Sequence, residues 1–128
     1  SGGEADWWNG LYRAEKAGLI RITQDTPKWE LRIGDKHLCN VKGDAAVVEL
    51  KAPGLGLTDF KPGVVRFLDY KGWHGDTPLS RHKRKHLRLA LGVELECVGE
   101  YVDRQHAAKA KAKADRDLIK RARNRPKS

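Results

Sequence analysis

The C-terminal segment of the chain contributes almost nothing to a hydrophobic core. Residues 103–128 consist largely of alanine, lysine and arginine, and their only large aliphatic side chains are Leu118 and Ile119. Such a segment has helix propensity but no apolar face to bury. We therefore predict one globular domain over residues 4–102 and a basic, Ala/Lys/Arg-rich helical extension over residues 103–128.

Apolar periodicity within the predicted domain indicates both strands and helices. An amphipathic helix is expected over residues 6–17, and a second over residues 78–91, where Thr77-Pro78 opens the helix and Gly92 ends it. The predicted strands cover residues 19–23, 28–33, 38–41, 45–51, 64–70 and 93–98. The chain is thus expected to be α+β, with a mostly antiparallel sheet of five or six strands.

Positive charge is concentrated in two segments. The formal net charge is +9, from 26 Lys or Arg and 17 Asp or Glu. Residues 101–128 hold ten basic side chains and three aspartates, and residues 81–88 hold five basic side chains and no acid. The rest of the chain carries 11 basic and 14 acidic groups. A nearly neutral body with two cationic segments is typical of proteins that bind a polyanion.

The predicted helix over residues 78–91 is the main candidate for contact with nucleic acid. At 100° per residue its cations fall on the side opposite Leu87 and its apolar neighbours, where they can meet phosphates. We therefore expect a non-enzymatic DNA- or RNA-binding module without a cofactor. The alternative is that the cations of this helix only keep its exposed face soluble and bind no ligand. The predicted contacts are Arg81, Lys83, Arg84, Lys85, Arg88, Lys109, Lys111, Lys113, Lys120, Arg121 and Arg123, with Trp73 stacking on a base.

A Glu-x-Lys pattern supports an enzymatic alternative. Glu49 and Lys51 lie two residues apart in a predicted strand, within the run ELKAPG. This run resembles the Glu-x-Lys element of restriction-endonuclease-like nucleases, in particular the VRR-NUC branch. The resemblance implies that Glu49 and an upstream Asp35 or Asp44 hold Mg²⁺ or Mn²⁺ beside a water-activating Lys51. The chain departs from the family pattern because LTDFKPG replaces the helix and Gln that follow the motif. Whether the chain is an enzyme stays open. The structural alternative to a metal site is that Glu49 and Lys51 are ordinary solvent-exposed residues at the end of a strand.

Three further interpretations depend on weaker patterns. His82 and His86 are spaced i, i+4 on the predicted helix, so with His74 they are a candidate metal site. The run from Leu11 to Ile33 resembles the helix and wing of winged helix-turn-helix proteins, but that family's two preceding helices are missing. The cationic surface also fits an adaptor that binds an acidic protein partner.

Cysteine and hydropathy patterns bear on the cellular setting. Cys39 and Cys97 lie far apart, and the chain contains no Cys-x-x-Cys. We therefore expect a reducing, intracellular location, either cytoplasmic or in the nucleoid or nucleus. No apolar run approaches the roughly 18 residues that a membrane-spanning helix needs, so no membrane partner is expected.

Overall fold

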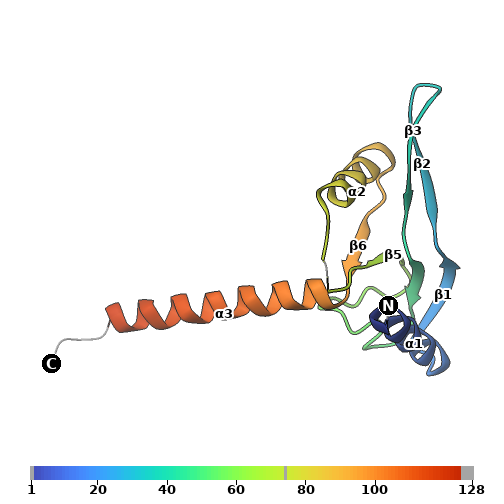
Figure 1. Ribbon diagram of the computed structural model, residues 1–128. Helices are drawn as coiled ribbons and strands as arrows, with labels where there is room; N and C mark the ends of the chain where they lie inside the picture. The colour runs from blue at the N-terminus through green and yellow to red at the C-terminus, as the bar shows by residue number, and fades with distance from the viewer. Residues whose placement is uncertain (1, 74, 125–128) are drawn as a thin grey trace.

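The computed structural model describes residues 2–73 and 75–124, and the described residues form an α+β fold (Figure 1). Helix α1 covers Gly2–Lys16 and is followed by four strands, a long connection and a fifth strand. Helix α2, strand β6 and helix α3 complete the chain. The bounds of these elements are β1 Ile20–Asp25, β2 Lys28–Ile33, β3 Lys36–Lys42, β4 Ala45–Glu49, β5 Val65–Tyr70, α2 Pro78–Leu91, β6 Leu95–Val98 and α3 Glu100–Arg123.

The first four strands form one long antiparallel ribbon with two parts. β1 pairs with β4 at its base and β2 pairs with β3 in its outer half. The two halves meet at Pro27 and Gly43, where the Gly43 amide donates to the Pro27 carbonyl at 2.8 Å. A Cβ atom on Gly43 would lie 2.9 Å from Leu95 Cδ1, so only glycine fits at this point without displacing its neighbour. The outer half therefore leaves the main sheet as a projecting hairpin (Figure 1).

The main sheet has the strand order β1-β4-β5-β6. β4 is antiparallel to both of its neighbours, whereas β6 is parallel to β5 because α2 carries the chain back before β6 begins. The central strand β4 is buried along its whole length. β4 and β5 are therefore held in a fixed register, and this register sets the positions of the polar residues at the ends of the two strands.

Two hydrophobic clusters hold the helices on the strands. Leu11 of α1 packs in a cluster with Val47 and Leu68 of the main sheet. Leu87 of α2 is fully buried in the other cluster, with Leu31 and Leu95. Because this second cluster joins the β2–β3 hairpin to α2 and β6, it fixes α2 beside the hairpin.

The α+β class and the predicted helix over residues 78–91 are confirmed, whereas the predicted single sheet is only partly right. Six strands are present in the described residues, but they form a mixed four-stranded sheet and a separate two-stranded one. Pro27 has no amide hydrogen for a strand ladder, and a side chain at Gly43 would displace the end of the Leu95 side chain. These two positions divide the ribbon where a continuous sheet was expected.

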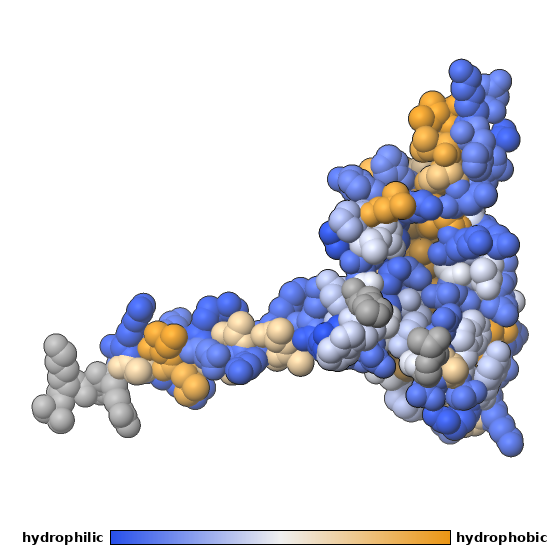
Figure 2. All heavy atoms as spheres, in the orientation of Figure 1, coloured by the Kyte–Doolittle hydropathy of each residue, from blue (hydrophilic) through white to orange (hydrophobic). Residues whose placement is uncertain are grey.

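Helix α3 extends away from the rest of the molecule (Figure 1). It has no buried residue along its 24 residues and begins three positions before the predicted boundary at residue 103. Its visible surface is mostly hydrophilic, with an apolar spot near its C-terminal end, where Leu118 and Ile119 are exposed (Figure 2). None of the helices in the described residues is long and apolar enough to cross a membrane.

Candidate functional site

Asp44 and Asp69 meet where β4 begins and β5 ends. The two strands are antiparallel, and Ala45 pairs with Leu68, so the residue before β4 lies beside the last residues of β5. The Asp44 amide donates to the Leu68 carbonyl at 2.8 Å, and the Tyr70 amide donates to Asp44 Oδ2 at 2.7 Å. Sheet register therefore brings the Asp44 carboxyl group next to that of Asp69.

The two carboxyl groups are placed where burial disfavours their charges. Asp69 is buried and Asp44 is half-buried. Burial is the largest cause that raises the pKa of Asp44, to about 6, and the neighbouring Asp69 raises it further, against the opposing effect of the Tyr70 amide. Within residues 2–73 and 75–124, no cationic side chain forms an ion pair with Asp44. The corner of the sheet thus holds two adjacent acids whose negative charge is only partly balanced.

Asp69 also contacts a lysine, Lys71. Residues two apart in an extended segment point to the same face, and Lys71 Nζ lies 3.0 Å from Asp69 Oδ2. The same ammonium group donates to Ser80 Oγ at 3.0 Å and lies 3.9 Å from Asp76 Oδ1. A half-buried lysine is therefore held directly beside the carboxylate pair.

Arg84 fixes helix α2 to this corner. Its guanidinium donates to both carboxylate oxygens of Asp76, in the loop before α2, and to Ser80 Oγ at 2.8 Å. The hydrogen bond from Arg84 is the largest cause that lowers the pKa of Asp76 below its usual value. Thr77 caps the helix by accepting a bond from the Ser80 amide at 3.1 Å. Arg84, predicted as a phosphate contact, is thus occupied with intramolecular bonds.

A groove leads from the acidic corner along α2. One cavity of about 300 Å³ lies between β3 and α2, and its lining includes Asp69 and Lys71. A second cavity, of about 270 Å³, continues along α2 toward β6. The cations lining the two cavities are Lys42, Lys71, Lys83 and Arg84 in the first and Arg81, Arg84, Lys85 and Arg88 in the second. Four of the five predicted α2 contacts thus border the groove without an ion pair to any described residue.

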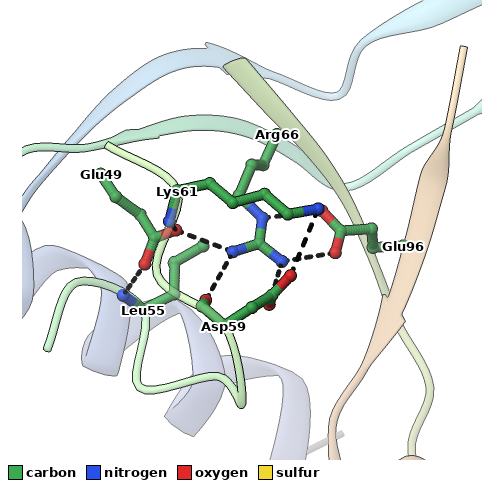
Figure 3. Close-up of polar contacts among 6 residues, drawn as sticks. All are labelled: Glu49, Leu55, Asp59, Lys61, Arg66 and Glu96. Carbon is green, nitrogen blue, oxygen red and sulfur yellow. Dashed lines mark hydrogen bonds and ion pairs between the residues drawn. The ribbon is translucent and has the colours of Figure 1, made fainter. Parts of the chain in front are cut away.

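The predicted Glu49 and Lys51 site is not assembled by the structure. Glu49 is fully buried and accepts bonds from Arg66 at 2.7 Å and from the Leu55 and Lys61 amides at 2.9 and 3.0 Å (Figure 3). Burial by itself raises the pKa of Glu49, but these hydrogen bonds hold it below its usual value. Lys51 lies beyond the end of β4 and is exposed. The two residues therefore do not share a strand face, and Glu49 belongs to an internal ion-pair network.

The remaining predicted residues fall at separate places. Asp35 is exposed in the β2–β3 turn, so Asp44 is the upstream aspartate that reaches the site. His82 and His86 are exposed on α2 with ring centroids 6.3 Å apart, and His74 lies outside the described residues. In the part of the chain that the structure describes, no three His, Cys, Asp or Glu side chains are arranged to hold a metal ion. Lys109, Lys111, Lys113, Lys120, Arg121 and Arg123 are all exposed along α3.

The Asp69-Tyr70-Lys71 element was missed from the sequence because it crosses a predicted boundary. The strand was expected to end at Tyr70 and a loop to begin at Lys71. The available signal was the same acid-x-Lys spacing sought at Glu49, located at the end of a strand and followed by a glycine. Comparison of the chain with models of protein families, with curated protein sequences and with solved structures gives no match. What the site does is therefore inferred from its own chemistry.

Proposed function

We propose that this protein is a metal-dependent nuclease whose active site contains Asp44, Asp69 and Lys71. The observation that carries the proposal is the convergence of two adjacent carboxyl groups and a lysine, of which Asp69 and Lys71 line a groove bordered by cations. An upstream aspartate and an acid-x-Lys pair are the groups that the nuclease resemblance required. Here they are supplied by Asp44 and by Asp69 with Lys71, in place of Glu49 with Lys51.

The donor set at this corner suits Mg²⁺ or Mn²⁺. Mg²⁺ is held in many phosphoryl-transfer sites by one or two carboxylates, and its other ligands are water and substrate phosphate. Asp44 and Asp69 would supply these two carboxylates; burial and the neighbouring Asp69 raise the pKa of Asp44, and a bound cation would offset both effects. A bound divalent cation stabilises charge on a phosphate and activates water for attack at neutral pH.

The chain's own residues then have distinct roles. Asp69 and Ser80 hold the Lys71 ammonium group, so that it can donate a hydrogen bond to a phosphate oxygen or to the attacking water. Arg81, Lys85 and Arg88 bind neighbouring phosphates along the groove. The exposed cations of α3 add sequence-independent attraction. An intracellular location, proposed from the sequence, agrees with a nucleic-acid substrate and with the two free cysteines.

The acidic pair also distinguishes cleavage from simple binding. Asp69, which lines the groove, and the adjacent Asp44 repel phosphate unless a cation lies between them and the ligand. A module that only binds nucleic acid, or an adaptor that binds an acidic protein, gains nothing from that arrangement. The nuclease proposal gives both the cations of α2 and the acids a role.

The direct test compares the wild-type protein with Asp69→Asn on plasmid DNA, a DNA oligonucleotide and RNA. We expect products with Mg²⁺ or Mn²⁺, none with EDTA, and none with Asp69→Asn. The exposed Asp35→Asn is the matched control, because it removes one acid from the far end of the hairpin and should leave cleavage unchanged. Salt-sensitive binding without products under any metal condition would instead support a non-enzymatic binding module.

Removing the α2 cations should weaken binding to nucleic acid. The triple variant Arg81→Ala, Lys85→Ala, Arg88→Ala removes three exposed cations that line the groove, so affinity should fall on every sequence. The slope of log affinity against log salt should decrease by up to about three, because fewer counterions are released. Electrophoretic mobility shifts over a salt series measure both quantities.

A charge-matched control separates local contact from net charge. Arg13→Ala, Lys16→Ala, Arg21→Ala also removes three exposed cations, from α1 and β1. If this variant loses as much affinity as the α2 variant, the groove has no special role and the effect is one of overall charge.

A further inference from the structure

Trp73 presents an indole ring to solvent at the edge of the proposed active site. It lies two residues after Lys71, in the connection between β5 and α2, and 66% of its surface is exposed. A tryptophan that only closes a loop onto the core would be buried. The exposed ring is thus available for contact with a ligand.

A single arginine of α3 holds the ring in place. The Arg104 guanidinium lies 3.9 Å from the centroid of the Trp73 ring, in a cation–π contact. The same side chain donates a hydrogen bond to the Trp73 carbonyl at 2.5 Å. Two contacts from one residue thus fix both the ring and the backbone of Trp73, and most of the ring remains open.

The surrounding loop is tied to the start of α3 as well. Gly75 has a φ of +80°, and a Cβ atom there would lie 2.6 Å from Tyr101 Cδ2, so this glycine is packed against the Tyr101 ring. A cavity of about 430 Å³ lies between this loop and the first turns of α1 and α3, and its lining includes Tyr70 and Trp73 as well as Glu4 and Glu100. Tyr70 donates its amide to Asp44, so the cavity adjoins the acidic corner. The exposed indole therefore borders open space that a ligand can enter.

The distance along the chain limits which part of a substrate reaches the ring. Two residues span at most about 7 Å between Cα atoms, so the backbone of Trp73 lies within that distance of the backbone of Lys71, the proposed phosphate contact. A nucleic-acid base stacks on an aromatic side chain only if that base has left the helical stack, because paired bases in a duplex have both faces covered. A base on Trp73 would belong to a nucleotide that is unpaired and close to the phosphate to be cleaved.

We propose that Trp73, positioned by Arg104, stacks on an unpaired base beside the active site and makes the protein select single-stranded over fully paired nucleic acid. This inference rests on the proposed function in one respect, namely that the substrate phosphate lies at Asp69 and Lys71. Trp73 is the specificity-determining residue and Arg104 is a positioning residue that acts through it.

The experiment measures equilibrium binding in EDTA, where the proposed chemistry does not proceed. Three labelled DNA probes are used with the full chain: a single strand, a blunt hairpin duplex, and a single strand of abasic nucleotides that keeps its phosphates. Trp73→Ala is expected to lower affinity for the single strand by about 5- to 100-fold, in line with the effect of losing one stacked base. Affinity for the duplex and for the abasic strand should change less than about twofold. Trp73→Phe should retain most of the wild-type preference.

Arg104→Lys tests the positioning role at constant charge. Lysine keeps the positive charge but not the planar guanidinium, so duplex binding should be unchanged while the single-strand preference falls toward that of Trp73→Ala. In the Trp73→Ala background, Arg104→Lys should have no further effect.

The possible failures are distinguishable. Equal losses on single strand, duplex and abasic strand in Trp73→Ala, or no loss on any of them, would overturn the stacking role. Absence of metal-dependent products from the wild-type protein overturns the nuclease proposal, but does not change the binding ratios measured in EDTA.

Discussion

Replacing Asp44 with asparagine is expected to abolish cleavage and to stabilise the metal-free protein at pH 7. Asparagine keeps an oxygen that can accept the bond from the Tyr70 amide, and its amide group can donate to Asp69. It removes one of two anionic groups proposed to bind the cation, so we expect cleavage to fall by more than about 100-fold. The same change removes a charge that burial and Asp69 disfavour, which should stabilise the fold by on the order of 2 kcal/mol.

The gain in stability should depend on pH in a defined direction. Folding raises the pKa of Asp44 from 3.8 to about 6, so the folded state binds a proton more readily than the unfolded state does. This contribution favours the wild-type fold below about pH 4 and is lost as the pH rises through 6. The difference between Asp44→Asn and wild type should therefore be small at pH 4 and largest above pH 6.5.

Urea unfolding in EDTA at several pH values measures this difference directly. Asp35→Asn is again the matched control, because Asp35 is exposed. A stability difference that is the same at pH 4 and pH 7 would contradict the proposed electrostatic strain between Asp44 and Asp69.

Arg66→Ala is expected to destabilise the protein by about 3–5 kcal/mol. The Arg66 and Glu49 side chains are only 2% and 0% exposed, and Arg66 also binds Asp59 and Glu96 (Figure 3). These acids, with Glu96 contributing most, raise the pKa of Arg66, so the guanidinium stays charged. Removing it leaves the Glu49 charge buried without its partner, and this is the costly outcome for an internal ion pair. Chemical unfolding of the purified variant measures the loss.

Two companion variants identify the cause. Lys61→Ala removes an exposed ion pair with Asp59, whose atoms lie 3.2 Å apart, and should cost less than about 1 kcal/mol. Adding Glu49→Gln to Arg66→Ala removes the uncompensated charge and should recover part of the stability. If Arg66→Ala costs no more than Lys61→Ala, the internal network does not stabilise the connection between β4 and β5.

Local signals predicted the elements of this fold better than their arrangement. Helix α2 was predicted with its observed bounds because Thr77, Pro78 and Gly92 are caps that act within a few residues. The division of the ribbon depends on Pro27 and also on the close approach of Gly43 to Leu95, a contact between segments far apart in sequence. Periodicity carries no information about such a contact, so the outer hairpin was assigned to the main sheet.

For the candidate site, too, individual residues were predicted from the sequence, whereas their neighbours in space were not. Asp44 was one of two upstream aspartates considered, and only the pairing of Ala45 with Leu68 shows which residue of β5 lies beside it. Glu49 matched the expected motif by spacing, but the spacing could not reveal that Arg66 lies on the same buried face. The cations of α2 were predicted from the sequence, whereas the engagement of Arg84 by Asp76 depends on the fold of the connecting loop.

The backbone at Gly43 links the groove to the chemistry. Lys42 belongs to the hairpin wall of the groove and Asp44 belongs to the acidic corner, and Gly43 alone separates them. A substitution at Gly43 that shifts this part of the backbone is therefore expected to displace both Lys42 and Asp44. Under the proposed function, the width available to nucleic acid and the alignment of the metal-binding carboxyl group would then change together.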